Sequence, residues 1–87
     1  MHQYVVLASV KTIRDSQRRR EALGRAIRQR REGIGLSQEK FGEAVDCHRN
    51  YVGLIERGQQ NITIDMLGRF AAALRCSIAD LAEQAGV

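Results

Sequence analysis

The sequence predicts an all-α fold in which five helices form one small, compact domain. Proline is absent and aromatic residues make up only 5% of the 87 residues, whereas alanine, leucine, arginine, glutamine and glutamate, which favour helices, are abundant. Apolar residues recur three and four positions apart, which is the period of an amphipathic helix. The shares of apolar residues, 44%, and of charged residues, 28%, are ordinary for a globular chain, so we expect one core.

An N-terminal extension, residues 1–20, is expected to precede the folded domain, residues 21–87. The extension reads MHQYVVLASVKTIRDSQRRR, so it begins apolar and ends basic. The apolar run from Val5 to Leu7 favours a strand or an irregular arm, whereas the spacing of Tyr4, Leu7 or Ala8, and Lys11 favours a turn of helix. Both conformations stay open for this segment.

The first helix of the domain is predicted over residues 21–33. Leu23 and Ile27 are four apart and share one face, while the other positions are polar and rich in arginine. The chain then alternates glycine, which can end a helix, with apolar residues that we expect to close the core: Gly33, Ile34, Gly35 and Leu36.

A short helix over residues 38–45 and a tight turn are predicted next. Ser37 is a suitable N-cap, and Phe41 and Val45 share one face of the helix. The helical pattern breaks at Asp46, a residue type that tolerates a left-handed backbone at modest cost. These features indicate a turn between two helices.

The second helix of this pair is predicted from about residue 48 to 57. With Val52 as the inward direction and about 100° of rotation per residue, Ile55, Glu56 and His48 fall on the inward side. The outward face and its flanks are formed by Asn50, Gly53, Leu54 and Arg57, with Arg49 and Tyr51 beside them.

Two further helices complete the expected domain. Thr63 is suited to cap a helix over residues 64–74. Its core-facing residues at helical spacing are Met66 or Leu67, Phe70, Ala71 and Leu74. A pattern like a capping box, Ser77 to Asp80, starts a short fifth helix whose Ile78 and Leu81 face inward.

Positive charge is concentrated in the first third of the chain. Residues 1–31 carry nine lysines and arginines against two carboxylates, a net charge of +7, whereas the remaining 56 residues carry −3. A polyanionic partner is one interpretation of this asymmetry, and a solvated helix face is the other. Beside such a pair of helices, we favour a nucleic acid. We expect the extension to pack on the domain or to reach the nucleic acid with Arg18 to Arg20. The alternative is a flexible extension.

The segment QEKFGEAVDCHRNYVGLIER, residues 38–57, resembles the helix-turn-helix of the Cro and phage-repressor family, which is also called XRE-like. In the pattern of that family the first position is glutamine and four later positions are apolar. This chain matches with Gln38, Phe41, Val45, Val52 and Ile55. The resemblance extends over residues 23–84 and implies a λ-repressor-like fold.

Three positions depart from the family pattern. Gly42 stands where alanine is usual, and Asp46 stands where glycine is usual. Arg75 replaces a glycine that the family usually has in a left-handed turn, which should cost about 1 kcal/mol.

The resemblance implies a sequence-specific transcriptional regulator that reads the major groove with the helix 48–57. In the family, the first turns of this helix contact bases, which here implies Arg49, Asn50 and Tyr51. Arginine can pair with guanine O6 and N7, and asparagine with adenine N6 and N7. The alternative is a solvated surface with a partly buried tyrosine. The segment RNYVGLIERG is also similar to the small controller proteins of restriction-modification systems.

DNA phosphates are expected at both ends of the two-helix unit. The first helix begins with free backbone N–H groups that favour an anion, so Ser37 and Gln38 are expected to hold one phosphate. Helix capping is a compatible alternative. Beyond the second helix, Arg57, Gln60 and Asn61 are expected to hold another.

Glu56 is expected to face the core, which is costly for a carboxylate without a partner. In the resembling family, an arginine near the end of the first helix pairs with this glutamate, and the matching residue is Arg31. We therefore expect a structural Arg31–Glu56 ion pair, with a free guanidinium edge that could touch a phosphate.

No metal, cofactor or enzymatic activity is expected. Cys47 and Cys76 lie far apart without a CxxC motif, and His2 and His48 offer no ligand spacing. Buried free thiols are favoured over a disulfide. We find no pairing of a nucleophile with a base and no glycine-rich phosphate loop. The apolar run at residues 4–10 is too short to span a membrane, so we expect a cytoplasmic location.

Double-stranded DNA is the expected partner, bound by a homodimer on a pseudo-palindromic operator, because one recognition helix reads only a few base pairs. The C-terminal helix offers a small apolar edge for pairing, formed by Ala82, Ala85 and Val87. RNA polymerase is a further candidate partner. The alternative is a protein-bridging adaptor or antitoxin-like module of the same fold that acts mainly through protein partners.

Overall fold

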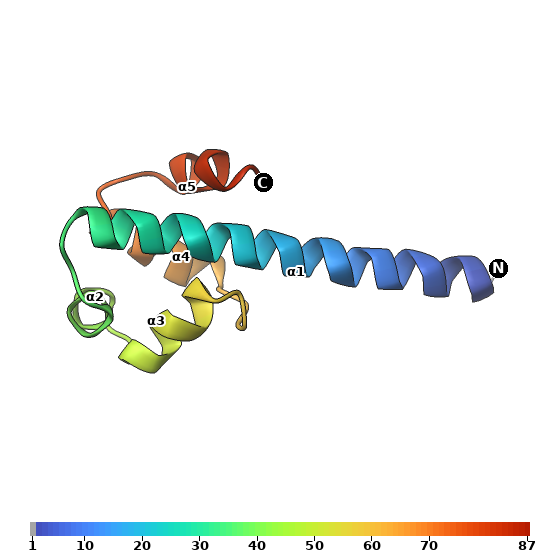
Figure 1. Ribbon diagram of the computed structural model, residues 1–87, viewed down its shortest axis with the longest axis horizontal. Helices are drawn as coiled ribbons and strands as arrows, with labels where there is room; N and C mark the ends of the chain where they lie inside the picture. The colour runs from blue at the N-terminus through green and yellow to red at the C-terminus, as the bar shows by residue number, and fades with distance from the viewer. Residues whose placement is uncertain (1) are drawn as a thin grey trace.

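The computed structural model describes residues 2–87, with side chains described from Ser9 onward. It consists of five α-helices in chain order, and the residues that it describes contain no strand. The helices are α1 (His2–Gly33), α2 (Gln38–Val45), α3 (Arg49–Glu56), α4 (Ile64–Ala73) and α5 (Ile78–Ala85) (Figure 1). The all-α, five-helix prediction is confirmed.

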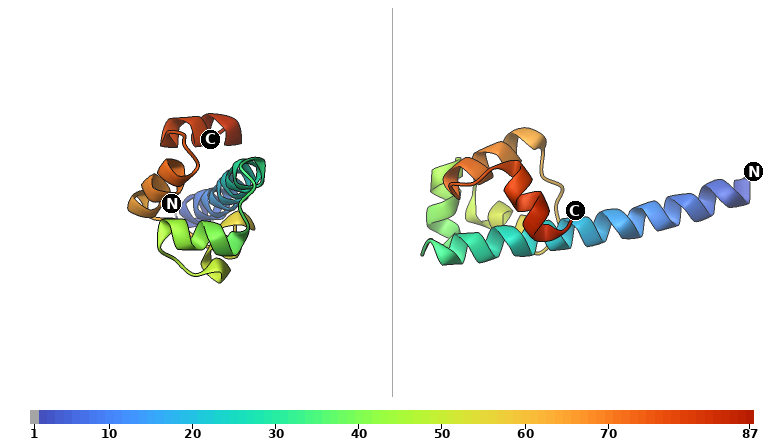
Figure 2. Two further views of the ribbon diagram at one scale, coloured as in Figure 1. Left: turned by 90° about the vertical axis from the view of Figure 1, so that its left-hand side faces the viewer. Right: turned by 90° about the horizontal axis from the view of Figure 1, so that it is seen from above.

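Helix α1 is much longer than expected, because it begins at His2 instead of residue 21. Its first half projects from the body of the molecule (Figure 2, right). Of the two conformations that stayed open for this segment, the backbone adopts the helix and not the strand or irregular arm. No glycine or proline lies between residues 2 and 23, and extending an existing helix costs far less than nucleating one. The division of the chain into an N-terminal extension, residues 1–20, and a folded domain, residues 21–87, stays a prediction.

Side-chain caps fix where the shorter helices start. Ser37 Oγ accepts from the Lys40 N–H at 3.0 Å, and Thr63 Oγ1 accepts from the Met66 N–H at 3.1 Å. Before α5, Ser77 and Asp80 form a reciprocal capping box. All three predicted caps are confirmed, since each satisfies a backbone donor that the first turn leaves free.

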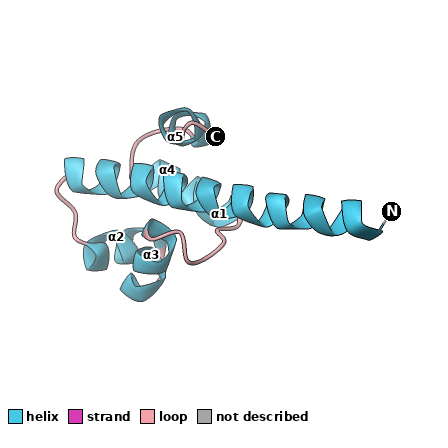
Figure 3. Cartoon of the chain, turned by 45° about the vertical axis from the view of Figure 1, so that its right-hand side comes forward, coloured by secondary structure: helices cyan, strands magenta, loops and turns pink. Residues whose placement is uncertain are grey.

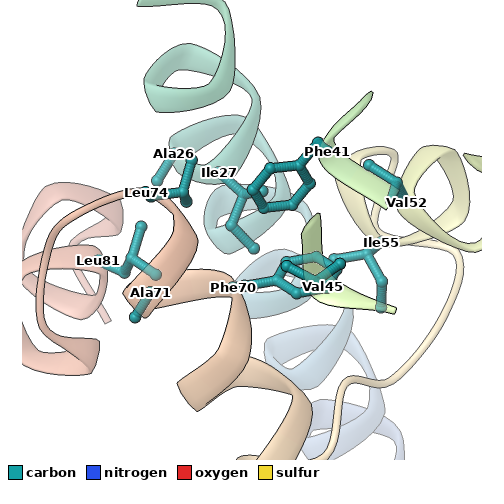
Figure 4. Packing of buried hydrophobic residues seen from close by; sticks show 10 residues of the cluster. All are labelled: Ala26, Ile27, Phe41, Val45, Val52, Ile55, Phe70, Ala71, Leu74 and Leu81. Carbon is teal, nitrogen blue, oxygen red and sulfur yellow. The ribbon is translucent and has the colours of Figure 1, made fainter. Parts of the chain in front are cut away.

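The core lies where helices α1 to α5 converge (Figure 4). Its largest members, Phe41 and Phe70, meet edge to face with ring centroids 4.9 Å apart. The other buried apolar residues are Ala26, Ile27, Val45, Val52, Ile55, Ala71, Leu74 and Leu81. Leu36 packs against this cluster as expected, but Ile34 is 43% exposed. Ile34 lies in the turn after α1 and is not among the residues that pack against the core.

In the views of Figures 1 and 3, α5 lies on one side of α1, and α2 and α3 lie on the other. The approach of α1 to α3 depends on Gly24, because a Cβ there would lie 2.4 Å from the carbonyl oxygens of Ile55 and Glu56. No described helix combines the length and the apolar character needed to cross a membrane.

Candidate nucleic-acid interface

The turn between α2 and α3 uses a left-handed residue, as the sequence predicted. Asp46 has φ 58° and ψ 50°, and the Cys47 N–H donates to the Gly42 carbonyl at 2.9 Å. A Cβ at Gly42 would lie 2.6 Å from the Cys47 carbonyl oxygen, so glycine lets the turn fold back closely on α2. Burial raises the pKa of the partly buried Cys47 thiol, which is free, as is Cys76.

His48 caps α3 and does not face the core as the helical rotation suggested. Its Nδ1 accepts from the Asn50 N–H at 3.0 Å, and the residue is exposed. The expectation failed because His48 is the N-cap, with extended backbone, so the helical rotation does not apply to it.

Helix α3 presents a mixed outer face. Val52, Ile55 and Glu56 are buried, as expected, and Arg49 and Asn50 are exposed. Gly53, expected on the outer face, is buried, because the Gln38 and Arg57 side chains lie over the position that its Cβ would occupy.

The three residues expected to contact bases are not equivalent. Arg49 and Asn50 line a shallow hollow on the outer face together with Gln38, Gly53, Leu54 and Arg57. The Arg49 side chain is 62% exposed, and its Nη1 is 3.8 Å from Glu39 Oε2 across the surface. Tyr51 is half-buried against the core, and desolvation raises its pKa. Leu54 was expected on this face, whereas Gln38 was not.

The Gln38 side chain makes a contact that was not expected, and its phosphate contact stays a prediction. Its Nε2 donates to Glu56 Oε1 at 3.0 Å, so the side-chain amide belongs to the ion pair at the end of α3. Its neighbour Ser37 is exposed and holds the helix start through its cap. In this arrangement, the backbone N–H groups of the first turn of α2 are the groups best placed to meet an anion.

Arg31 and Glu56, which were expected to pair, lie together in a buried ion pair. Their side chains are 9% and 2% exposed, with Arg31 Nε 2.6 Å from Glu56 Oε2. Arg31 Nη1 also donates to the Leu36 carbonyl at 2.7 Å. The hydrogen bond to Glu56 raises the pKa of Arg31. Three of the five guanidinium N–H groups are therefore occupied and the side chain is nearly covered, which leaves little of it for the expected phosphate contact.

The loop after α3 connects the expected phosphate contacts to α1. Arg57 Nε donates to Gln59 Oε1 at 3.1 Å, and Arg20 Nη1 donates to Asn61 Oδ1 at 3.3 Å. Gln60 and Asn61 line a hollow with Gln17, Arg20, Gly58 and Gln59. Gln17 and Gln59 were not expected in the site. The spacing of residues 17, 20, 24 and 27 along one face of α1 could have placed Gln17 and Arg20 there.

Nothing in the described residues points to a metal centre, since no cluster of histidine, cysteine or carboxylate side chains could hold an ion. The arrangement offers exposed hydrogen-bond donors, among them Arg49 and Asn50, on a short helix. These features are typical of a surface that recognises another molecule.

Comparison with known proteins agrees with this geometry. The helix-turn-helix family matches residues 27–87. The control protein C.SmaI from Serratia marcescens is 35% identical over 68 residues, which are 78% of this chain and 81% of that protein. The control protein C.BamHI from Bacillus amyloliquefaciens is 37% identical over 59 residues, which cover 67% and 73% of the two chains.

Solved structures give the same result. The clp gene regulator ClgR from Corynebacterium glutamicum superposes with a TM-score of 0.76 at 32% identity, covering 78% of this chain and 72% of that one. The restriction-modification controller protein C.AhdI from Aeromonas hydrophila superposes with a TM-score of 0.68 at 34% identity, covering 70% and 92%. With its α2-turn-α3 unit, this chain belongs to the helix-turn-helix family of DNA-binding transcriptional regulators, and it is homologous to restriction-modification control proteins.

Proposed function

We propose that this protein is a sequence-specific regulator of the controller type, which reads the major groove with α3. The observation that carries the proposal is the outer face of α3, where Arg49 and Asn50 are exposed in the first turn. Both side chains can form two hydrogen bonds to one base edge. The buried face of α3 and the Arg31–Glu56 ion pair hold this surface in a fixed position.

Phosphate contacts would flank the bases that α3 reads. We infer that the start of α2, with Ser37 and Gln38, meets one phosphate through its backbone N–H groups. Arg57, Gln60 and Asn61 would meet a second beyond α3. The exposure of these three residues supports that role.

The proposed functional unit is a homodimer that pairs through the C-terminal helix. On α5, Leu81 is buried, while Ala82 and Ala85 are half-buried and Val87 is 51% exposed. This apolar edge is small, so we expect weak association of the free protein and tighter association on DNA. A two-fold dimer would place two copies of α3 about 34 Å apart, on a pseudo-palindromic operator. A regulator bound in this way acts by contacting RNA polymerase or by excluding it from the promoter.

Selection from a random duplex pool, followed by sedimentation of the protein on the selected duplex, tests the proposal. We expect an inverted repeat with half-sites one helical turn apart and two protein copies per duplex. An asymmetric site bound by one copy would contradict the dimer. Failure to enrich any sequence would contradict sequence-specific binding.

A further inference from the structure

Arg20 ties the long helix α1 to the loop that follows α3. Its Nη1 donates to Asn61 Oδ1 at 3.3 Å, and its Nη2 donates to Gln17 Oε1 at 3.1 Å. The first contact joins residues 41 positions apart in the sequence. Arg20 also precedes the segment, residues 27–87, that matches the helix-turn-helix family.

The loop packs directly on α1 beside Arg20. Gly58 has φ +71°, and a Cβ there would lie 2.7 Å from Glu21 Cγ and 2.8 Å from Glu21 Cα. Only glycine therefore allows this approach. The loop after α3 lies on the side of α1 that carries α2 and α3 (Figures 1 and 3). The hydrogen bond to Asn61 joins the Arg20 guanidinium to this loop.

The positive charge of Arg20 lacks a carboxylate among its hydrogen-bond partners. Both acceptors, Asn61 and Gln17, are neutral amides, and none of the four ion pairs in the described residues includes Arg20. The nearby Glu21 carboxylate accepts from the Gln17 amide instead, at 3.1 Å. The guanidinium is thus oriented by groups that leave its charge available, whereas the charge of Arg31 is neutralised by Glu56.

A hydrogen bond between Arg57 and Gln59 links the hollow beside Arg20 to the hollow on the outer face of α3. The hollow beside Arg20 has a volume of about 450 Å³ and is lined by polar residues and one glycine: Gln17, Arg20, Gly58, Gln59, Gln60 and Asn61. Gln59 also accepts from Arg57, which lines the hollow over α3. Hydrogen-bond donors therefore follow one another from the first turn of α3 to α1.

We propose that Arg20, positioned by Asn61 and Gln17, binds a DNA backbone phosphate at the edge of the site that α3 reads. This inference rests on the proposed DNA-binding mode. Phosphate oxygens are stronger acceptors for a guanidinium than neutral amides, so they replace one of these contacts without moving the side chain far. Helix α1 thereby adds one phosphate contact per protomer from outside the family segment.

The salt dependence of binding tests this proposal with a matched pair of variants, Arg20→Gln and Arg19→Gln. Both remove one positive charge from neighbouring positions of α1. Arg19 lies on a different face, lining a hollow beside the C-terminal end, residues 85–87, and donating to Ser16. Glutamine keeps a long side chain that can still donate to Asn61. The dissociation constant is measured from 50 to 300 mM salt on the selected operator and on a random duplex.

For Arg20→Gln, the slope of log K against log salt should become shallower by about 0.9 per bound protomer, on operator and random duplex alike. Arg19→Gln should keep the parental slope. Arg20→Lys should also keep the parental slope, because the lysine ammonium still displaces a counterion. Its affinity should fall a few-fold, because lysine lacks the planar guanidinium that can form two hydrogen bonds to one phosphate. Thermal melting checks that each variant is folded.

Equal slopes for Arg20→Gln and Arg19→Gln would overturn the proposal, whether both change or neither does. Loss of operator affinity without loss on the random duplex would also overturn it, because a phosphate contact is blind to sequence. If the parent protein itself selects no operator, the proposed function fails before the role of Arg20 is reached. The two failures are therefore distinguishable.

Discussion

Arg31 and Glu56 face each other through two parallel hydrogen bonds, Nε to Oε2 at 2.6 Å and Nη2 to Oε1 at 3.0 Å. The pair joins α1 to the last residue of α3, and Gln38 adds a third hydrogen bond from α2. Three helices thus share one buried carboxylate. The position of the recognition helix relative to the rest of the domain depends on this contact.

The ion pair gives the first prediction. Arg31→Ala should lower the free energy of unfolding by about 3 to 5 kcal/mol, because Glu56 would remain buried without its partner. Denaturant unfolding at pH 7 measures the loss. Arg28→Ala is the control on the same helix, since its contact to Glu32 at 3.5 Å is exposed and worth less than about 0.5 kcal/mol.

A double-mutant cycle of Arg31→Ala and Glu56→Ala then isolates the coupling between the two side chains. The double variant should lose much less stability than the sum of the single variants. Additive losses would show that the two residues stabilise the fold separately.

Two glycines in helices predict opposite responses to alanine. Gly24→Ala should destabilise by about 1 to 3 kcal/mol, because its Cβ would meet α3 backbone atoms at 2.4 Å and helices α1 and α3 would have to separate. Gly68→Ala should stabilise by about 1 kcal/mol, since nothing lies within 4 Å of its Cβ and alanine favours the helix. Denaturation midpoints measure both changes. A shift of the same sign for both would contradict the proposed packing of α1 on α3.

Arg75 predicts a stabilising substitution. It has φ 60° in the turn after α4, and its N–H donates to the Ala72 carbonyl at 3.1 Å. Arg75→Gly should therefore raise the free energy of unfolding by about 1 kcal/mol, because glycine adopts this conformation without a Cβ clash. Arg75→Ala serves as the control, since it removes the charge and keeps the Cβ. Equal stability of both variants would rule out backbone strain at this position.

The capping box of α5 predicts that the stability of the fold depends on pH in the acidic range. Hydrogen bonds from the backbone N–H and the side chain of Ser77 lower the pKa of Asp80. A lowered folded-state pKa gives stability that is fully present above the unfolded pKa and is lost as the pH falls through the folded one. Below about pH 4, the stability difference between the parent and Asp80→Asn should therefore shrink. Asp65→Asn is the control, from the first turn of α4. A difference that does not change with pH would contradict the role of the ionised carboxylate.

Local chemistry made much of the fold predictable. Some features depend only on residues within one turn of helix, so both partners of each contact are neighbours in the sequence. These features are the caps at Ser37, Thr63 and Ser77 and the left-handed turn at Asp46. No short-range rule connects positions 31 and 56. The pairing of Glu56 with Arg31 could therefore be predicted only from the family resemblance.

Contacts that depend on how helices cross could not be predicted in the same way. The contact of Arg20 with Asn61 requires both the continuation of α1 beyond residue 21 and the angle at which it passes the loop. The hydrogen bond from Gln38 to Glu56 likewise depends on how α2 and α3 are placed relative to each other. Ile34 was expected in the core because it is apolar. The sequence gives no information on the direction of its side chain in the turn, and the residue is exposed.

Substitution of Arg49 tests whether α3 reads DNA sequence. Selection from one random duplex pool is run in parallel with the parent, Arg49→Ala and Arg69→Ala, an exposed arginine of α4 that serves as the charge-matched control. Arg49→Ala should melt like the parent, because its contact to Glu39 is exposed. It should lose about 1 to 3 kcal/mol of operator affinity and the base preference at one position of each half-site, whereas Arg69→Ala keeps both. If Arg49→Ala selects the parental operator with parental affinity, Arg49 does not read DNA sequence, and the proposed role of α3 as the reader is contradicted.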